Sequence, residues 1–201
     1  NIPNLPYMVK WVVPSNNIVT NMCGDTHGYQ PTINEMFRNM RISTQDYSAI
    51  IDEKMFLLLN NIFIGLGDYM DRGGNSLKVM ATFMLFKIKN RKNVLLIRGN
   101  HEESQLNMLS GLREEILKIE TNPETIEKIN LTLCKVYETM PAAVILGYKK
   151  NNEIKYQFIT HGCPDIRVAY NNFLNYDTQN LKQFGGKRFC ELKKVNISSL
   201  N

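Results

Sequence analysis

The chain has 201 residues, of which 43% are hydrophobic and 21% are charged, and its formal net charge is +5. This length and composition are typical of one globular domain with a large core, and they exclude a disordered chain. No apolar run approaches the ~18 residues of a membrane span, and the basic residues are scattered, so we expect neither a membrane span nor a nucleic-acid partner.

The first predicted elements alternate between strands and helices. Residues 17–25 predict a strand that ends at a Gly turn, and residues 31–40 predict a helix that opens on Pro31. We expect residues 50–61 to be helical as well. The short apolar run at residues 61–68 then predicts a buried strand.

The middle of the chain continues this alternation. Residues 76–90 predict a helix that is capped by Asn75 or Ser76. The apolar face expected for this helix carries Leu77, Met80, Met84 and Ile88. Residues 93–100 predict a third buried strand, which a helix at residues 102–120 follows at once.

A further helix is predicted at residues 123–140, where Asn122-Pro123 forms the cap and Pro141 the stop. Its expected apolar face carries Ile126, Ile129, Leu133 and Val136. Residues 142–148 and 154–162 then predict a pair of strands. The order of strands and helices predicts an α/β fold whose functional residues gather at the carboxyl ends of the strands.

Four of the predicted strands end in a motif that could bind a metal or a phosphate. The motifs are GDTHG (24–28), GDYMDRG (67–73), RGNHE (98–102) and THGC (160–163). Taken singly, each could be an ordinary turn or a surface ion pair. Together they contain all three histidines of the chain, and an α/β sheet would bring the strand ends to one edge. The sequence therefore predicts a single metal site at that edge.

In this order the motifs resemble the metallophosphoesterase signature. Asp71 and Arg72 within GDYMDRG resemble more specifically the phosphoprotein phosphatase (PPP) family of serine/threonine phosphatases. The resemblance covers roughly residues 18–164. It implies an α/β fold of four layers, α/β/β/α, in which a sandwich of β-sheets is flanked by helices. We expect residues 1–201 to form a single catalytic domain that lacks part of its C-terminal half.

The resemblance also implies a dinuclear metal site. Asp25 and His27 would bind one metal ion, and Asp68 would bridge both ions. Asn100 and His161 would bind the other ion. This mixture of carboxylate, amide and imidazole suits Mn²⁺, or an iron and zinc pair, better than calcium.

Three residues next to these ligands would act on the substrate. Arg72 would bind the phosphate through its planar guanidinium group. Asn100, as a neutral ligand, would limit the negative charge where the dianionic substrate arrives. His101 would donate a proton to the leaving oxygen, and Asp71 would orient its imidazole.

The sequence departs from the family's pattern at three points. The spacing between Asp25 and Asp68 is longer than expected, which predicts an insertion within residues 41–60. Cys163 stands where the family has a second Gly. No His follows His161, whereas the family has a further metal-binding His and a second phosphate-binding Arg. We therefore expect residues 1–201 alone to bind one metal ion tightly and the second poorly, with low turnover.

These residues predict a phosphatase that acts on phosphoserine and phosphothreonine in protein substrates, through a water activated by two metal ions. A nucleotide or dinucleotide phosphoesterase and a tyrosine-directed phosphatase are alternatives, because the motifs recognise the phosphate and not its carrier. A module that binds phosphorylated partners without turnover is a further alternative. The sequence does not indicate an oligomeric state.

The spacing of the cysteines indicates the cellular compartment in which the protein is expected. Cys23, Cys134, Cys163 and Cys190 lie far apart and form no C-x-x-C pair, which predicts neither a zinc ribbon nor a disulfide framework. The opening residues lack the pattern of a signal peptide. A reducing compartment such as the cytoplasm fits best, and the Asn- and Lys-rich composition is compatible with a microbial effector that acts in a host cytosol.

Overall fold

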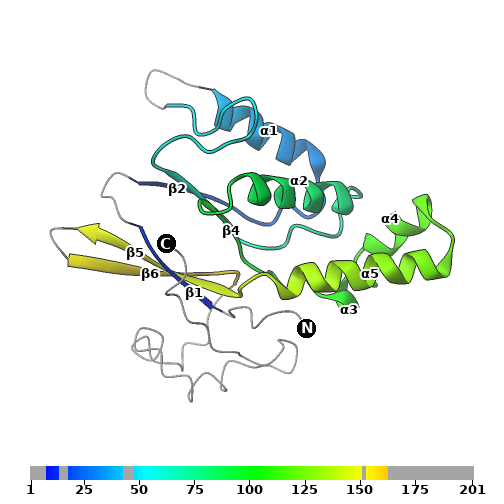
Figure 1. The fold of residues 1–201 in the computed structure, drawn as a ribbon. Coiled ribbons are helices and arrows are strands. Elements are labelled where there is room, and N and C mark those ends of the chain that lie inside the picture. Colours follow the sequence, from blue (N-terminus) through cyan, green and yellow to red (C-terminus); the bar gives the residue numbers. More distant parts are fainter. Residues whose placement is uncertain (1–7, 14–17, 43–47, 151–152, 163–201) are drawn as a thin grey trace, which may run out of the picture.

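The computed structural model describes residues 8–13, 18–42, 48–150 and 153–162. Two three-stranded sheets lie in adjacent layers (Figure 1). In the first sheet, β2 (Val19–Cys23), β3 (Asn61–Gly65) and β4 (Val94–Leu96) are all parallel. The second sheet has the order β1-β5-β6.

The second sheet mixes both strand directions. β1 (Met8–Val12) pairs in parallel with β5 (Ala143–Lys150), and β5 pairs in antiparallel with β6 (Glu153–Thr160). The last two strands confirm the predicted strand pair. The sequence analysis did not predict β1, whose five residues alternate too briefly to stand out without their partner strand.

Helices cover one face of the first sheet. α1 (Gln30–Arg41) and α2 (Ser76–Lys89) lie above it in Figure 1. α3 (Ser104–Asn107), α4 (Leu112–Ile119) and α5 (Pro123–Glu138) lie together to one side. Three of the four expected layers are thus present, and the prediction of a helical layer outside the second sheet falls outside the described residues. No helix in the described part of the chain is long and apolar enough to span a membrane.

Strand β3 separates two hydrophobic cores because its side chains alternate between the faces of the sheet. Phe63 packs toward the helices, where it contacts Phe83 and Phe86 of α2. Ile62 and Ile64 pack toward the second sheet. Their partners there are Ile97, Val144, Leu146 and Ile159. Burial on both faces explains why this strand is a continuous apolar run.

Residues 50–61 do not form the predicted helix. The segment folds into a loop in which Ile51 and Leu57 form an isolated antiparallel bridge. The Asp52 carboxylate accepts a hydrogen bond from the Phe56 amide, and Asn90 at the end of α2 binds the loop through its amide. These bonds replace the helical ones, and the apolar spacing alone did not reveal them.

Two other helices differ from expectation. The single helix predicted at residues 102–120 is split into α3 and α4 by a turn at Gly111, where φ is +111°. On α2, Met80 is buried as predicted, whereas Ile88 is exposed and Val79 takes part in the core instead. Apolar residues occur on every side of α2, so the sequence did not determine which side is buried. The cap of α5 is confirmed, because Asn122 Oδ1 accepts from the backbone amides of the first turn.

The candidate metal and phosphate site

Parallel strands bring the predicted motifs to one edge. Cys23 at the end of β2 lies opposite Gly65 at the end of β3, and Gly65 lies opposite Leu96 at the end of β4. The chain enters GDTHG, GDYMDRG and RGNHE directly after these positions. The fourth motif arrives from the other sheet, because His161 follows β6 directly.

The loops after β2 and β3 continue to bind each other beyond the sheet. The backbone amides of Asp25, His27 and Gly28 donate to the carbonyl oxygens of Gly67, Asp68 and Tyr69, at 2.8–3.1 Å. This ladder places the two loops side by side. Gly73 completes the contact, since a Cβ at this position would collide with the backbone of His27 and Gly28. The small residue is therefore required for the close approach of the loops.

Unusual backbone geometry is concentrated in these loops. Seven residues other than Gly have positive φ in the described part of the chain, and five of them are predicted site residues. These five are Asp25, His27, Asp68, Asp71 and Arg72, with φ between 43° and 71°. Left-handed backbone is disfavoured for residues with a side chain, and it gathers at functional sites. The geometry thus marks the same residues as the motifs do, by an independent criterion.

Asp68 lies at the centre of the site. One of its carboxylate oxygens accepts from the His101 backbone amide at 2.9 Å. The other oxygen lies 3.8 Å from His27 Nε2 and 3.3 Å from His161 Nε2. Two groups of metal-competent side chains share this carboxylate: His27 and His101 on one side, and Asp25 and His161 on the other. The arrangement allows Asp68 to bridge two cations.

The histidine tautomers fit a metal site. His27 Nδ1 and His161 Nδ1 lie 3.2 Å and 2.9 Å from backbone carbonyl oxygens of the loop after β3. Because a carbonyl only accepts, each Nδ1 carries a hydrogen, and each Nε2 is the ring nitrogen directed toward the site. His161 Nε2 faces Asn100 Oδ1 at 3.0 Å as well as Asp68. An imidazole nitrogen, an amide oxygen and a carboxylate oxygen that converge in this way can serve as ligands to a divalent metal ion, so the donor set fits such an ion.

Asp25 lies in the exposed part of the site. Its side chain is 68% exposed and lies 3.7 Å from His161 Nδ1. Asp25 thus lies in one group with Asp68 and His161, and its predicted pairing with His27 at one metal ion stays a prediction. His27 contacts His101, with ring centroids 4.8 Å apart in an edge-to-face arrangement.

His101, Asp71 and Arg72 form a connected set beside the metal ligands. His101 Nδ1 lies 2.8 Å from Asp71 Oδ2, and both side chains are buried. His101 Nε2 lies 3.0 Å from Arg72 Nη2. A guanidinium group only donates, so Nε2 accepts here and Nδ1 donates to Asp71. Arg72 itself is exposed, which leaves most of its donors available to an anion.

Glu102, to which the sequence analysis gave no role, binds these loops together. Its fully buried carboxylate accepts from the backbone amides of Asp68, Tyr69 and Gly99, at 2.7–2.9 Å. Burial raises the pKa of this carboxyl group, and the three amide donors oppose that rise. The sequence pointed to Glu102 through its position next to His101 in the RGNHE motif.

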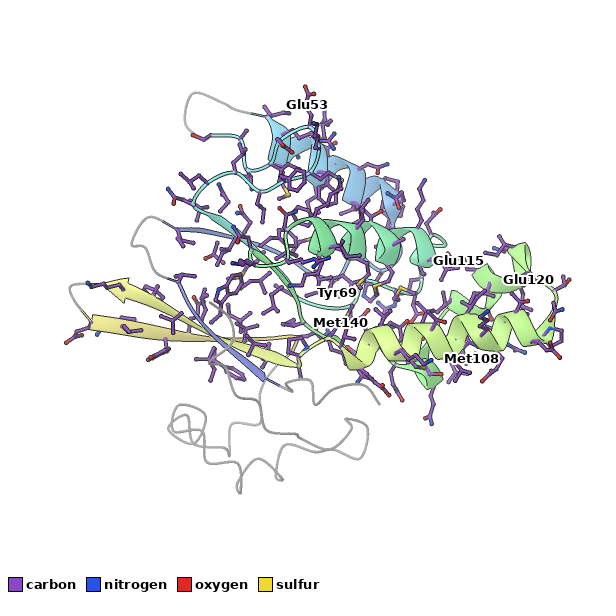
Figure 2. The ribbon with its side chains drawn as sticks, in the orientation of Figure 1. Glu53, Tyr69, Met108, Glu115, Glu120 and Met140 are labelled. Carbon is purple, nitrogen blue, oxygen red and sulfur yellow. The ribbon has the colours of Figure 1, made fainter. Side chains whose placement is uncertain are left out.

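Two further residues support Asp71 from the helices. The Asp71 amide donates to Ser76 Oγ at 2.9 Å, at the start of α2. Glu115 of α4 accepts from the amides of Ser76 and Leu77 and so caps α2, in place of the predicted Asn75 or Ser76 side chain. Figure 2 shows Glu115 beside the start of α2. Sequence offers no signal for this cap, because the donor and acceptor elements are far apart in the chain.

Comparison with known proteins agrees with this geometry. Residues 20–191 match the calcineurin-like phosphoesterase family model. The chain is 30% identical over 183 residues to serine/threonine-protein phosphatase SIT4 of Candida albicans, covering 90% of this chain and 50% of that protein. It is 33% identical over 128 residues to serine/threonine-protein phosphatase PP1-1 of Saccharomyces cerevisiae, covering 64% of this chain and 35% of that protein. The chain thus spans about half the length, or less, of these relatives.

A solved structure shares the fold. It is a protein serine/threonine phosphatase from Saccharomyces cerevisiae with similarity to human phosphatase PP5. The match has a TM-score of 0.61 and 23% identity, and it covers 96% of this chain and 50% of that structure. This likeness confirms the predicted α/β sandwich class. By its family match, the chain belongs to the calcineurin-like phosphoesterase family.

Proposed function

We propose that this protein is a metal-dependent phosphatase that hydrolyses phosphoserine and phosphothreonine monoesters in protein substrates. The family match supports phosphoester hydrolysis, and the two curated relatives are named serine/threonine-protein phosphatases. One observation carries the proposal most directly. The buried His101 and Asp71 pair lies between the exposed Arg72 and the shared carboxylate of Asp68.

In this proposal the family's two divalent metal ions would be held around Asp68. His27 and Asp25 would bind one ion, and Asn100 and His161 the other, with Mn²⁺ or an iron and zinc pair as the metals. When bound, such ions supply positive charge to the phosphate oxygens and lower the pKa of water. The neutral amide of Asn100 keeps the negative charge of the ligand set low where the anionic substrate enters.

The remaining residues act on the phosphate and on the leaving group. Arg72 exchanges its contact with His101 Nε2 for the phosphate oxygens, to which its planar fork donates in pairs. The freed Nε2, which carries no hydrogen while it accepts from Arg72, takes up a proton from solvent and gives it to the leaving oxygen as the bond to phosphorus breaks. Asp71 holds the ring through Nδ1 throughout, so the acid keeps its orientation.

A substrate panel tests this proposal. With Mn²⁺ present, the chain should hydrolyse an aryl phosphate and phosphoserine or phosphothreonine peptides, and EDTA should abolish turnover because the carboxylate and imidazole ligands act through metal. Initial rates on these peptides should exceed those on a phosphotyrosine peptide and on a dinucleoside polyphosphate. Preference for either of the latter would contradict the proposed substrate class. Full activity after metal removal would contradict the metal chemistry, and binding of phosphopeptide without any turnover would identify a non-catalytic module.

A further inference from the structure

A buried chain of polar side chains leads from the site into the helices. Tyr137, in the last turn of α5, has its hydroxyl 2.8 Å from Asn107 Oδ1. Asn107 Nδ2 lies 2.7 Å from both Asp71 Oδ2 and the His101 carbonyl oxygen. Tyr137, Asn107 and Asp71 are 1%, 4% and 0% exposed, so water does not compete for these bonds.

The chemistry of these groups fixes which of them donates and which accepts in each hydrogen bond. The Asp71 carboxylate and the His101 carbonyl can only accept, so Asn107 must present its NH₂ group to them. The amide oxygen of Asn107 then points the other way, into the buried interior, where it needs a donor. Tyr137 supplies that donor. If the amide were reversed, its oxygen would face two acceptors, so these acceptors select the orientation and the Tyr137 hydroxyl satisfies the buried amide oxygen that results.

Asp71 depends on this support. Its φ of 71° is one that its own side chain disfavours. Carboxylate oxygen Oδ2 accepts from both His101 and Asn107, whereas the partner of Oδ1 within the described residues is the Leu112 amide, at 3.3 Å. The plane of the carboxylate, and with it the direction of the His101 ring, is therefore set largely through Asn107.

Tyr137 is suited to remain a donor. Its pKa is raised, first by burial and then by the negative charges of Glu102 and Asp71. The hydroxyl thus keeps its hydrogen at neutral pH. Neither Tyr137 nor Asn107 exchanges a proton during the reaction.

We propose that Asn107 and Tyr137 are positioning residues, which hold Asp71 and through it aim His101 Nε2 at the leaving oxygen. This inference rests on the proposed function, in which His101 is the general acid. In that step the proton moves from His101 Nε2 to the leaving oxygen as the bond between this oxygen and phosphorus breaks. A group that aims the acid matters most when the leaving oxygen is a poor leaving group, as in the alkyl esters of serine and threonine.

The experiment measures how kcat of the 201-residue chain, with Mn²⁺ present, depends on the leaving group of the substrate. Tyr137→Phe removes one hydroxyl and keeps the ring in the core. We expect it to lower kcat on a phosphoserine peptide by about tenfold, a part of the 10²–10⁴-fold effect of a whole general acid, with a smaller loss on p-nitrophenyl phosphate. Asn107→Ser, which cannot reach both partners, should steepen the dependence on leaving-group pKa further. His101→Asn serves as the reference for complete loss of the acid.

Tyr69→Phe is the matched control. Tyr69, labelled in Figure 2, is equally buried, and its hydroxyl donates to the Ile97 carbonyl oxygen at 3.0 Å. Loss of this hydroxyl should lower the melting temperature but leave the dependence of kcat on leaving-group pKa unchanged. If His101→Asn steepens this dependence and neither Tyr137→Phe nor Asn107→Ser does, the inference is overturned and the proposed function stands. If His101→Asn itself leaves the dependence unchanged, the acid role in the proposed function fails.

A second readout does not require turnover. The His101 Nδ1 proton, shared with Asp71, should give a downfield proton NMR resonance in the folded protein. Tyr137→Phe and Asn107→Ser should shift or broaden that resonance, because both change the carboxylate that accepts it. Tyr69→Phe should not. An unchanged resonance in both variants would overturn the inference whatever their activity.

Discussion

Exposure separates two kinds of side chain at the candidate site. His101 and Asp71 are buried, so their contact is held in one geometry and little screened by water. Arg72 and Asn100 are exposed at the same edge and can meet a ligand from solvent. The residues proposed to orient the acid are thus buried, and those proposed to meet the phosphate are accessible.

Replacing His101 by Asn should separate catalysis from metal binding. We expect kcat on phosphopeptides to fall by about 10²–10⁴-fold, the usual contribution of a general acid, while metal content stays near that of the parent chain. Asp68→Asn should lose metal and turnover together, because both groups of ligands share its carboxylate. Steady-state kinetics beside elemental analysis measures both effects. Loss of metal from the His101 variant would show that His101 is itself a ligand.

At the scale of elements, α4 stabilises α2 and the site together. The Glu115 carboxylate caps α2, and the first residue of α2 accepts from the backbone of Asp71. A carboxylate at a helix start satisfies free amides and interacts favourably with the helix dipole. The loop that carries Asp71 and Arg72 is therefore held by a contact between two helices.

Removal of this cap should lower stability. Glu115→Ala should reduce the free energy of unfolding by about 0.5–2 kcal/mol, as for other lost helix caps. At roughly 2–4 °C per kcal/mol for a chain of this size, the melting temperature should fall by a few degrees. Glu114→Ala is the control, because Glu114 is an exposed neighbour in the same first turn of α4. Equal melting temperatures for the two variants would show that the cap contributes nothing measurable.

The elements that sequence predicted well are those with a strong local pattern. β3 is a continuous apolar run and α1 is an amphipathic helix with a buried stripe, and both formed near the expected residues. The loop at residues 50–61 lacks any helix breaker, yet contacts with Asn90 and with the end of α1 decide its conformation. β1 is likewise defined by its pairing with β5, which lies more than a hundred residues away. Such long-range contacts leave little trace in a short window of sequence.

At the scale of the whole molecule, the site joins two sheets. Asp68 and Asn100 come from the first sheet, and His161 comes from the second. The core between the sheets, which includes Ile159, sets the distance between these ligands. Motifs could indicate the candidate ligands from sequence because their chemistry is local to each strand end. Glu102, Asn107 and Glu115 were not assigned, because only the fold shows what they contact.

Loosening this core should weaken metal binding. Ile159→Ala should cost about 2–5 kcal/mol of stability, as other buried truncations to Ala do, and should also raise the Kd for metal, because His161 lies two residues further on. Ile116→Ala, in the core beneath the helices, should cost a similar amount of stability and leave the Kd for metal unchanged. Metal titration by calorimetry below the unfolding range distinguishes the two variants. An equal change in Kd for both would mean that overall stability alone controls metal affinity.

The left-handed backbone at five predicted site residues bears on how this chain can be engineered. Gly or Asn would adopt those φ values more readily than Arg72 or His27 does, at a gain of about 1 kcal/mol for a position. A screen that selects for thermal tolerance alone would therefore favour such substitutions at this edge and would erase the proposed phosphate and metal contacts. Selection for stability in this chain should be coupled to selection for metal binding, because the two demands oppose each other at the same residues.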